Sequence, residues 1–398
     1  MKVNALSQLL DLPESERKTR GLVHTPAEIA QQPDTWQSTF DLFKRRRAEI
    51  REFLASAGLA VDPRVRPTVF LVGAGTSDYI GKSLAYLFRK TWLCDAVAIP
   101  STDLLTHMDE LCLPGKKYLW ISFSRSGDSP EGVSVLERAY KRRPDIYHLV
   151  ISCNANGRMI RASVGNPQVL SVCLDDAVND RGLAMTSSFS NMAIFGQCLS
   201  HYGEIERYEH VLPQLIRAGQ SFLPIAADAA AELARGPYTK ACFVGSGPLR
   251  AVARESALKL LELTAGKVVT MSESALGLRH GPMAALDQKT LFVCFLSSNK
   301  RVQEYERNLL EEIGSKRLVT TRVVVAGSAV SGMNAVAEKN LAPAVPVPVA
   351  DDYRPAVDVI FGQVLGLFFS LRWNLRPDCP SPNGAISRVV QNVISVPD

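Results

Sequence analysis

The sequence has few of the features that mark secreted, membrane-spanning or metal-binding proteins. None of its eight cysteines stands in a Cys-x-x-Cys pair, so neither a disulfide framework nor a structural zinc site is expected. The best apolar run, 359–371, contains Gln363 and is shorter than the roughly 20 residues that a membrane span needs. The N-terminus has no uninterrupted apolar stretch of the kind found in secretory signals. We therefore predict a cytoplasmic protein with buried, reduced thiols and no membrane partner.

A large excess of one charge sign is also missing. Lys and Arg number 45 against 40 Asp and Glu, which leaves a net charge of +5 over 398 residues. This small excess does not favour nucleic acid or an anionic membrane as a partner, and a small anionic substrate fits it equally well. No cluster of His, Asp and Glu has the spacing of a metal site, so we expect no metal and no cofactor.

An internal repeat is the strongest organisational feature. Four apolar segments of the first half recur in the same order in the second, at offsets of 172 to 176 residues. The pairs are TVFLVGAGTS (68–77) with KACFVGSGPL (240–249), KYLWISFSRSG from 117 with KTLFVCFLSSN from 289, HLVISCNANG from 148 with RVVVAGSAVSG from 322, and VLSVCLDD ending at 176 with VPVPVADD ending at 352. The repeat predicts two similar units of about 150 residues each.

Continuous apolar runs alternate with helical patterns in each half. Such runs are typical of strands that are covered on both faces, so we predict an α/β fold with a doubly wound, mostly parallel sheet in each half. Helices are expected at about 34–57, 79–92, 131–143 and 250–265, with linking helices within 204–235. The predicted organisation is an N-terminal helical segment (1–48), a first domain (49–205), a linker helix (206–222), a second domain (223–372) and a C-terminal tail over the active site (373–398).

Two loops of the first half are rich in Gly and hydroxyl residues and lead directly into predicted helices. One is Gly73–Ser77 and the other is Ser122–Glu131. Backbone N–H groups at a helix start, together with hydroxyls, form an anion-binding cradle, and parallel sheets bind ligands at the carboxyl ends of their strands. A dinucleotide fingerprint fails because Asp78 stands where the third glycine belongs, and a Walker pattern is absent. Each loop alone could be ordinary turn and helix-cap chemistry, but the two together predict one phosphate pocket.

The second half carries charge where the first carries hydroxyls. Glu255, Lys259 and Glu262 lie at i, i+4 and i+7 on an otherwise largely apolar helix, within an arc of roughly 60°. They form either a solvent-facing stripe with a weak ion pair or a charged face that points into a cleft. Downstream, His280 lies in a turn bounded by Gly281 and Pro282; a lone histidine of this kind is usually structural or simply exposed.

These motifs together resemble the SIS (sugar isomerase) fold. ESALKLLEL followed by LRHGPMAALD is similar to the isomerase half of glucosamine-6-phosphate synthase, with about two more residues between helix and loop. The tail PDCPSPNGAISRVV resembles the closing segment of that family. The glutaminase domain of the synthase is missing, so glutamine is not the expected nitrogen donor. Among double-SIS proteins the full-length pattern resembles the AgaS group, described as galactosamine-6-phosphate deaminase/isomerases or tagatose-6-phosphate ketose/aldose isomerases.

The resemblance implies a set of site residues. Glu262 matches the enolisation base, His280 the ring-opening histidine that reaches a neighbouring subunit, and Lys259 a lysine near the open-chain sugar. Arg388 stands where the synthase has a tail lysine and is the fourth catalytic candidate. Asp128 replaces a glutamate of the synthase, whose role does not carry over. The groups that would hold the substrate phosphate are Gly75, Thr76, Ser77, Ser124, Arg125, Ser126 and Ser129. The resemblance also implies a homodimer or higher oligomer with shared active sites.

The residue types suit aldose–ketose chemistry. One carboxylate can move a proton between C1 and C2 of a sugar, and an imidazole can exchange protons with the ring oxygen near neutral pH. We predict an enzyme that converts D-galactosamine 6-phosphate to D-tagatose 6-phosphate and ammonia. Two alternatives in this class are a tagatose-6-phosphate ketose/aldose isomerase and a glucosamine-6-phosphate deaminase. An alternative of another class is a sugar-phosphate sensor without turnover; the C4 configuration of the sugar is not legible.

Overall fold

The chain forms two compact units, each described here by itself. The computed structural model describes residues 3–346, 349–381, 383–384 and 386–390. The first-half unit comprises Thr35–Asp180, Ser187–Glu209 and Ile386–Asp398; the second-half unit comprises Met1–Asp34, Arg181–Thr186 and His210–Ala385. The domain boundaries given above stay a prediction, and residues 391–398 of the predicted tail lie outside the described part of the chain.

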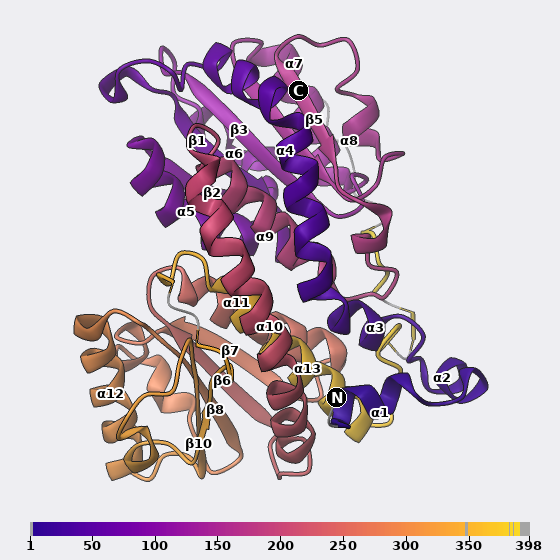
Figure 1. Ribbon diagram of the computed structural model, residues 1–398, viewed down its shortest axis with the longest axis vertical. Coiled ribbons are helices and arrows are strands. Elements are labelled where there is room, and N and C mark those ends of the chain that lie inside the picture. Colours follow the sequence, from indigo (N-terminus) through magenta and orange to yellow (C-terminus); the bar gives the residue numbers. More distant parts are fainter. Residues whose placement is uncertain (1–2, 347–348, 382, 385, 391–398) are drawn as a thin grey trace. The chain divides into compact units, whose positions relative to one another are not determined.

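Each unit contains one five-stranded sheet in which all paired strands are parallel. The order is β2-β1-β3-β4-β5 in the first and β7-β6-β8-β9-β10 in the second (Figure 1). The strands are β1 (Thr68–Gly73), β2 (Ala96–Pro100), β3 (Tyr118–Ser124), β4 (Tyr147–Ser152), β5 (Val169–Cys173), β6 (Lys240–Gly245), β7 (Val269–Ser274), β8 (Thr290–Leu296), β9 (Thr321–Ala326) and β10 (Lys339–Leu341). The predicted α/β class and the doubly wound sheets are confirmed.

Helices flank both sheets (Figure 1). They are α1 (Ala5–Leu10), α2 (Glu14–Arg20), α3 (Thr25–Ala30), α4 (Gln32–Ser56), α5 (Thr76–Trp92), α6 (Ser101–Leu111), α7 (Pro130–Arg142), α8 (Arg158–Arg161), α9 (Ser187–Ser200), α10 (Ile205–Leu233), α11 (Leu249–Leu263), α12 (Lys300–Ser315) and α13 (Pro355–Arg372). Short 3₁₀ turns occur at η1 (Pro63–Val65), η2 (Asp176–Val178), η3 (Gly277–Arg279), η4 (Pro282–Ala285) and η5 (Met333–Ala335). The predicted helices are all present, and the linking region is a single helix, α10.

The shared strand order bears out the internal repeat, with one correction. β1 and β6 begin 172 residues apart, as do β3 and β8, and β4 and β9 match as predicted. The fourth pairing was wrong, because the counterpart of β5 is β10 and not the segment 345–352. The described residues of that segment form no strand, and 347–348 lie outside the described residues. Alternating prolines explain the difference, since proline cannot donate a ladder hydrogen bond.

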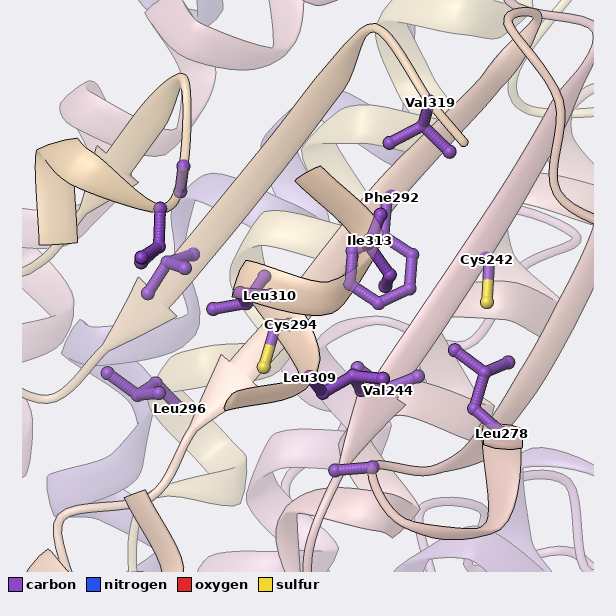
Figure 2. Packing of buried hydrophobic residues seen from close by; sticks show 14 of the residues in the cluster. Cys242, Val244, Leu278, Phe292, Cys294, Leu296, Leu309, Leu310, Ile313 and Val319 are labelled. Atoms are coloured by element: carbon purple, nitrogen blue, oxygen red, sulfur yellow. The ribbon is translucent and has the colours of Figure 1, made fainter. Parts of the chain in front are cut away.

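The core of the second-half unit lies between its sheet and α12. Leu309, Leu310 and Ile313 of α12 pack against Phe292 and Cys294 of β8 (Figure 2). The spacing of the three leucine and isoleucine residues puts them on one helical face, as expected for an amphipathic helix on a sheet. Helix α11 packs on β6, β7 and β8 and against α13.

Helix α13 is the one described helix that is long and apolar enough to cross a membrane by length and composition. It is longer than the interrupted run 359–371 suggested, but 89% of its apolar stretch is buried inside the protein. Gln363 on this helix donates to the backbone oxygen of Thr186 and accepts from Gln32 at 2.6 Å. A buried amide with such partners is typical of a core helix.

The cysteines form no disulfide among the described residues. Five of them are buried, and burial raises the pKa of the Cys242 thiol to about 12 and that of Cys112 to about 11. Cys379 is exposed, which corrects the expectation of uniformly buried thiols.

Candidate active site

The loop after β1 brings Gly75, Thr76 and Ser77 to the start of α5. Gly75 has φ +56°, a left-handed conformation that favours glycine, and it is the N-cap of the helix. Thr76 and Ser77 follow as the first helical residues, and both are buried. The Ser77 N–H donates to the Ala74 carbonyl at 3.1 Å, so the turn is closed by its own backbone. The start of a helix carries a partial positive charge, which favours an anion near this loop.

The loop after β3 uses its hydroxyls to shape itself. Ser124 Oγ accepts from the Gly127 N–H at 3.0 Å, and Ser126 Oγ accepts from the Asp128 N–H at 3.1 Å. Ser129 caps α7 by accepting from the Gly132 N–H at 3.3 Å. The three serine oxygens therefore accept hydrogen bonds within the loop and at the helix start, as expected for turn and helix-cap residues. Each hydroxyl hydrogen is still a donor, which leaves the phosphate interpretation open as well.

The two loops lie at neighbouring positions of one sheet edge. β1 pairs with β3 in parallel register, with Val72 opposite Ser122. The carboxyl ends of these strands therefore lie side by side within the first-half unit. The side chains of both loops that are predicted to bind phosphate therefore lie at the same edge of the sheet, where doubly wound sheets bind their ligands.

Asp128 fixes the second loop to the segment after β4. Its carboxylate accepts from the Arg158 N–H at 2.9 Å and from Asn154 Nδ2 at 3.3 Å. Asn154 Nδ2 also donates to the Ser126 carbonyl at 2.8 Å. Sequence reasoning missed Asn154, because a single Asn in a Gly-containing loop has no distinguishing spacing. Asp128 thus has a structural role in holding the loop.

The C-terminal segment joins the same loop through two arginines. Arg125, which is buried, donates from Nη2 to the Arg388 carbonyl at 2.7 Å. Arg388 in turn donates from Nε to the Asp180 carbonyl at 2.7 Å and from Nη2 to Asn179 Oδ1. All four residues belong to the first-half unit. Arg388 therefore anchors the C-terminal segment next to the loop that follows β3.

The charged face of α11 is a buried ion network. Lys259 Nζ lies 2.6 Å from Glu262 Oε2 and 3.4 Å from Glu255 Oε1. Glu255 and Lys259 have no exposed surface, whereas the Glu262 side chain is 25% exposed. The burial of Glu255 and Lys259 excludes the interpretation that this face of the helix points to solvent. The network presents a single accessible carboxylate, Glu262, with a cation hydrogen-bonded behind it.

His280 lies in the second-half unit, in the turn between η3 and η4. Its neighbour Arg279 is held by Glu312 at 2.7 Å and by Asn308 at 2.8 Å, and Gly281 has φ +116°. The His280 side chain is exposed and makes no hydrogen bond to another residue of the described chain. The structure therefore brings Lys259 and Glu262 together and places His280 on the surface of its unit.

No group of three or more His, Cys, Asp or Glu side chains in the described ranges could hold a metal ion. Glu262, Lys259 and His280 belong to the second-half unit. The residues predicted to bind phosphate, among them Gly75 and Arg125, belong to the first-half unit.

Several known proteins match this chain over more than nine-tenths of its length and of their own. A candidate D-galactosamine-6-phosphate deaminase AgaS of Streptomyces coelicolor is 37% identical over 93% of this chain and 94% of its own length. The D-galactosamine-6-phosphate deaminase AgaS of Escherichia coli is 31% identical over 94% and 95%. The chain belongs to the AgaS family. No protein-family profile matches it.

Solved structures support the same assignment of the AgaS fold. A candidate tagatose-6-phosphate ketose/aldose isomerase of Clostridium novyi aligns with a TM-score of 0.91 at 28% identity, covering 99% of both chains. The C-terminal domain of glucosamine-fructose-6-phosphate aminotransferase of Francisella tularensis aligns with a TM-score of 0.73 at 18% identity, over 90% of this chain and 99% of that one. The latter likeness concerns the fold alone, and it agrees with two tandem SIS domains.

Proposed function

We propose that this AgaS-family chain is an amino-sugar-phosphate deaminase/isomerase that converts D-galactosamine 6-phosphate and water to D-tagatose 6-phosphate and ammonia. The observation that carries the proposal is the Lys259–Glu262 pair, in which one partly exposed carboxylate is backed by a buried cation at 2.6 Å. The names of the Escherichia coli and Streptomyces coelicolor relatives support the choice of substrate.

The phosphate would be bound at the sheet edge of the first-half unit. The proposed donors are the hydroxyls of Thr76, Ser77, Ser124, Ser126 and Ser129 and the buried guanidinium of Arg125, with Gly75 at the turn that starts the helix. Charge-assisted hydrogen bonds of this kind fix a phosphate more strongly than neutral ones do. A bound phosphate fixes one end of the sugar and so limits the orientations that the substrate can adopt.

The reaction proceeds by ring opening, proton transfer between C2 and C1, and hydrolysis of the imine. His280 protonates the ring oxygen and takes the anomeric hydroxyl proton, which gives the open-chain aldehyde. Glu262 removes the proton from C2 while the aldehyde oxygen O1 takes up a proton, so that an enolamine forms. Glu262 then gives its proton to C1 while the C2 nitrogen releases one proton to water, so that the C2 imine forms. Water then adds to C2 and ammonia leaves, which gives the ketose. The Lys259 cation stabilises the negative charge that develops on oxygen in the enolamine step.

Arg388 has a positioning role and does not transfer a proton. Its guanidinium is committed to the Asn179 and Asp180 oxygens, and arginine is a poor proton carrier because it stays charged. The tail that it anchors runs next to Arg125. The exposed side chain of His280 is consistent with a homodimer or higher oligomer in which this residue completes the site of another subunit.

A second candidate is a tagatose-6-phosphate ketose/aldose isomerase, which the name of the Clostridium novyi relative favours. Glucosamine-6-phosphate deamination is a third candidate. One experiment separates them: purified protein is given galactosamine 6-phosphate, glucosamine 6-phosphate and tagatose 6-phosphate, and ammonia and sugar products are measured together. We expect ammonia and ketose in equal amounts from galactosamine 6-phosphate. Isomerised product without ammonia contradicts the deaminase proposal, and binding without any product indicates a sensor.

A further inference from the structure

The second half contains its own copy of the loop that follows β3. In the copy, β8 ends at Leu296, and Ser297, Ser298 and Asn299 lead into the 16-residue helix α12. Like the first-half loop, the copy has serine hydroxyls directly before a helix start. The Ser297 N–H donates to the buried Glu306 carboxylate at 2.8 Å, and the Asn299 N–H donates to Ser297 Oγ at 3.1 Å. By duplication alone, it would be a second phosphate site.

A carboxylate of the chain itself occupies this copy. Asp351 accepts from the Ser298 N–H at 2.9 Å, from Ser298 Oγ at 2.6 Å and from Ser297 Oγ. These are two hydroxyl donors and one backbone donor, the same kinds of group that the first-half loop offers to a phosphate. Asp351 comes from the segment that precedes α13, and all these residues belong to the second-half unit.

Asp351 is held in place as an anion. Arg354 Nη1 donates to Asp351 Oδ1 at 2.9 Å and to the Leu296 carbonyl at 2.8 Å, and its Nη2 donates to Asp358 at 2.7 Å. Burial raises the pKa of Asp351, but the Arg354 charge and the Ser297 and Ser298 hydrogen bonds outweigh it, so the pKa falls below its ordinary value. The carboxylate therefore stays ionised.

The two serines that bind Asp351 also line a cavity. A cavity of about 390 Å³ lies against Ser297, Ser298 and Ala350, and Lys300 lines it with a positive charge. A tetrahedral oxyanion could therefore reach the two serines if the Asp351 carboxylate were removed.

We propose that Asp351 is an internal substitute for phosphate, which fills the second-half copy of the anion site and keeps that half from binding a sugar phosphate. The inference goes beyond the deaminase proposal, because it concerns a different loop. It explains how a duplicated chain keeps one phosphate site, and it assigns the latent site to a phosphate monoester or inorganic phosphate.

The test removes the carboxylate and offers inorganic phosphate in its place. In Asp351→Ala, the amides of residues 296–303 should exchange hydrogen about tenfold faster than in the parent, because the loop loses its acceptor. Inorganic phosphate at about 20 mM should restore their protection. Asp351→Asn is the matched control: its amide fills the same space, so phosphate should restore nothing.

Hydrogen exchange of the parent protein with and without phosphate is an independent test. Phosphate should leave residues 296–303 unchanged there, whereas protection of 124–132 reports on the first-half loop and hence on the proposed function. Protection of 296–303 by phosphate in the parent overturns the inference, as does equal behaviour of Asp351→Ala and Asp351→Asn. If Asp351→Ala does not fold, Asp351→Ser takes its place with the same expected outcomes.

Discussion

Lys259 Nζ and Glu262 Oε2 lie 2.6 Å apart on α11, with the lysine fully buried and the glutamate partly exposed. The burial of a cation next to a reachable carboxylate is costly unless the cation has further partners. Glu255, with no exposed surface, supplies the second partner at 3.4 Å. The three charges therefore form one unit in which only Glu262 can meet a substrate.

Replacing Lys259 with Met should destabilise the protein, because the fully buried Glu255 carboxylate then loses the cation that lies 3.4 Å from it. The expected loss in free energy of unfolding is about 3–5 kcal/mol. Urea unfolding of the variant measures it. The double variant Glu255→Gln with Lys259→Met removes both charges and should recover much of the loss. A loss below about 1 kcal/mol for Lys259→Met would contradict a buried network and would fit an exposed ion pair.

Replacing Glu262 with Gln should abolish turnover and spare binding, since the amide keeps the shape but cannot take the C2 proton. General-base catalysis contributes about 10²–10⁴-fold, so we expect kcat to fall by that range. Product assays give kcat, and a substrate-dependent rise in melting temperature gives binding. Glu304→Gln, an exposed position on α12, is the control and should behave like the parent. A parent protein that binds the sugar phosphate without turnover would indicate a sensor.

Replacing His280 with Asn should slow ring opening most. Because ring opening precedes enolisation, a substrate analogue that cannot cyclise should be processed by the variant at a rate close to that of the parent. Turnover rates of the variant and the parent on the sugar phosphate and on the analogue that cannot cyclise show whether ring opening is the step affected. Equal losses on both substrates would place the role of His280 elsewhere. If His280 serves another subunit, mixing His280→Asn with Glu262→Gln protein should restore activity in mixed oligomers.

Most of the fold could be predicted from the sequence. The elements that were missed or misplaced have physical causes. The central strands β1, β3, β6 and β8 are continuous apolar runs, because both faces of a parallel sheet are covered. The edge strands β2 and β7 were missed, since they are only partly buried and read as AVAIP and VTMSES. β10 is three residues long, which is too short to leave a pattern, and the nearby VPVPVADD was taken for it.

The candidate site could be predicted in its residues but not in its contacts. The spacing of Glu255, Lys259 and Glu262 put them on one helical face. Whether that face met solvent depended on packing from α13, which is about 100 residues away in the chain. The hydrogen bond from Asn154 to Asp128 likewise joins two loops across a separation of 26 residues in the chain, so no local sequence pattern could predict it.

Glu306 should make the protein less stable as pH rises. Burial raises the pKa of Glu306 from 4.5 to about 7, with Asp351 adding to the rise, while the Ser297 N–H and Arg354 oppose it. The folded state therefore keeps a proton that the unfolded state releases between pH 4.5 and 7. The stability that this protonation contributes is present below pH 4.5 and is lost as pH rises through 7, on the order of 3 kcal/mol.

Glu306→Gln removes this titration, since its amide oxygen can still accept from the Ser297 N–H. The variant should match the parent near pH 4.5 and be more stable than the parent above pH 7. Thermal unfolding across pH 4.5–8 measures the difference. Glu311→Gln, exposed on the same helix, should give a difference that does not change with pH. A flat difference for Glu306→Gln as well would mean that the buried carboxyl does not titrate in this range.

Gly73 and Gly245 occupy equivalent places, and the repeat makes them controls for each other. An added Cβ at Gly73 would meet the Ser77 carbonyl carbon at 2.4 Å, and one at Gly245 would meet the Leu249 oxygen at 2.4 Å. Each contact is with the backbone of the following helix, so alanine must displace α5 in one case and α11 in the other. Overpacking of this kind costs about 1–3 kcal/mol, and both variants should unfold at lower temperature.

The kinetic effects of the two variants should differ, because the displaced helices have different tasks. Gly73→Ala shifts the Thr76 and Ser77 donors and should raise KM for the sugar phosphate, with a smaller change in kcat. Gly245→Ala shifts the helix that bears Glu262 and should lower kcat, with a smaller change in KM. Steady-state kinetics of both variants at a temperature where each is folded provides the comparison. A KM for Gly73→Ala equal to that of the parent, in a variant with the expected loss of stability, would mean that the start of α5 does not bind the phosphate.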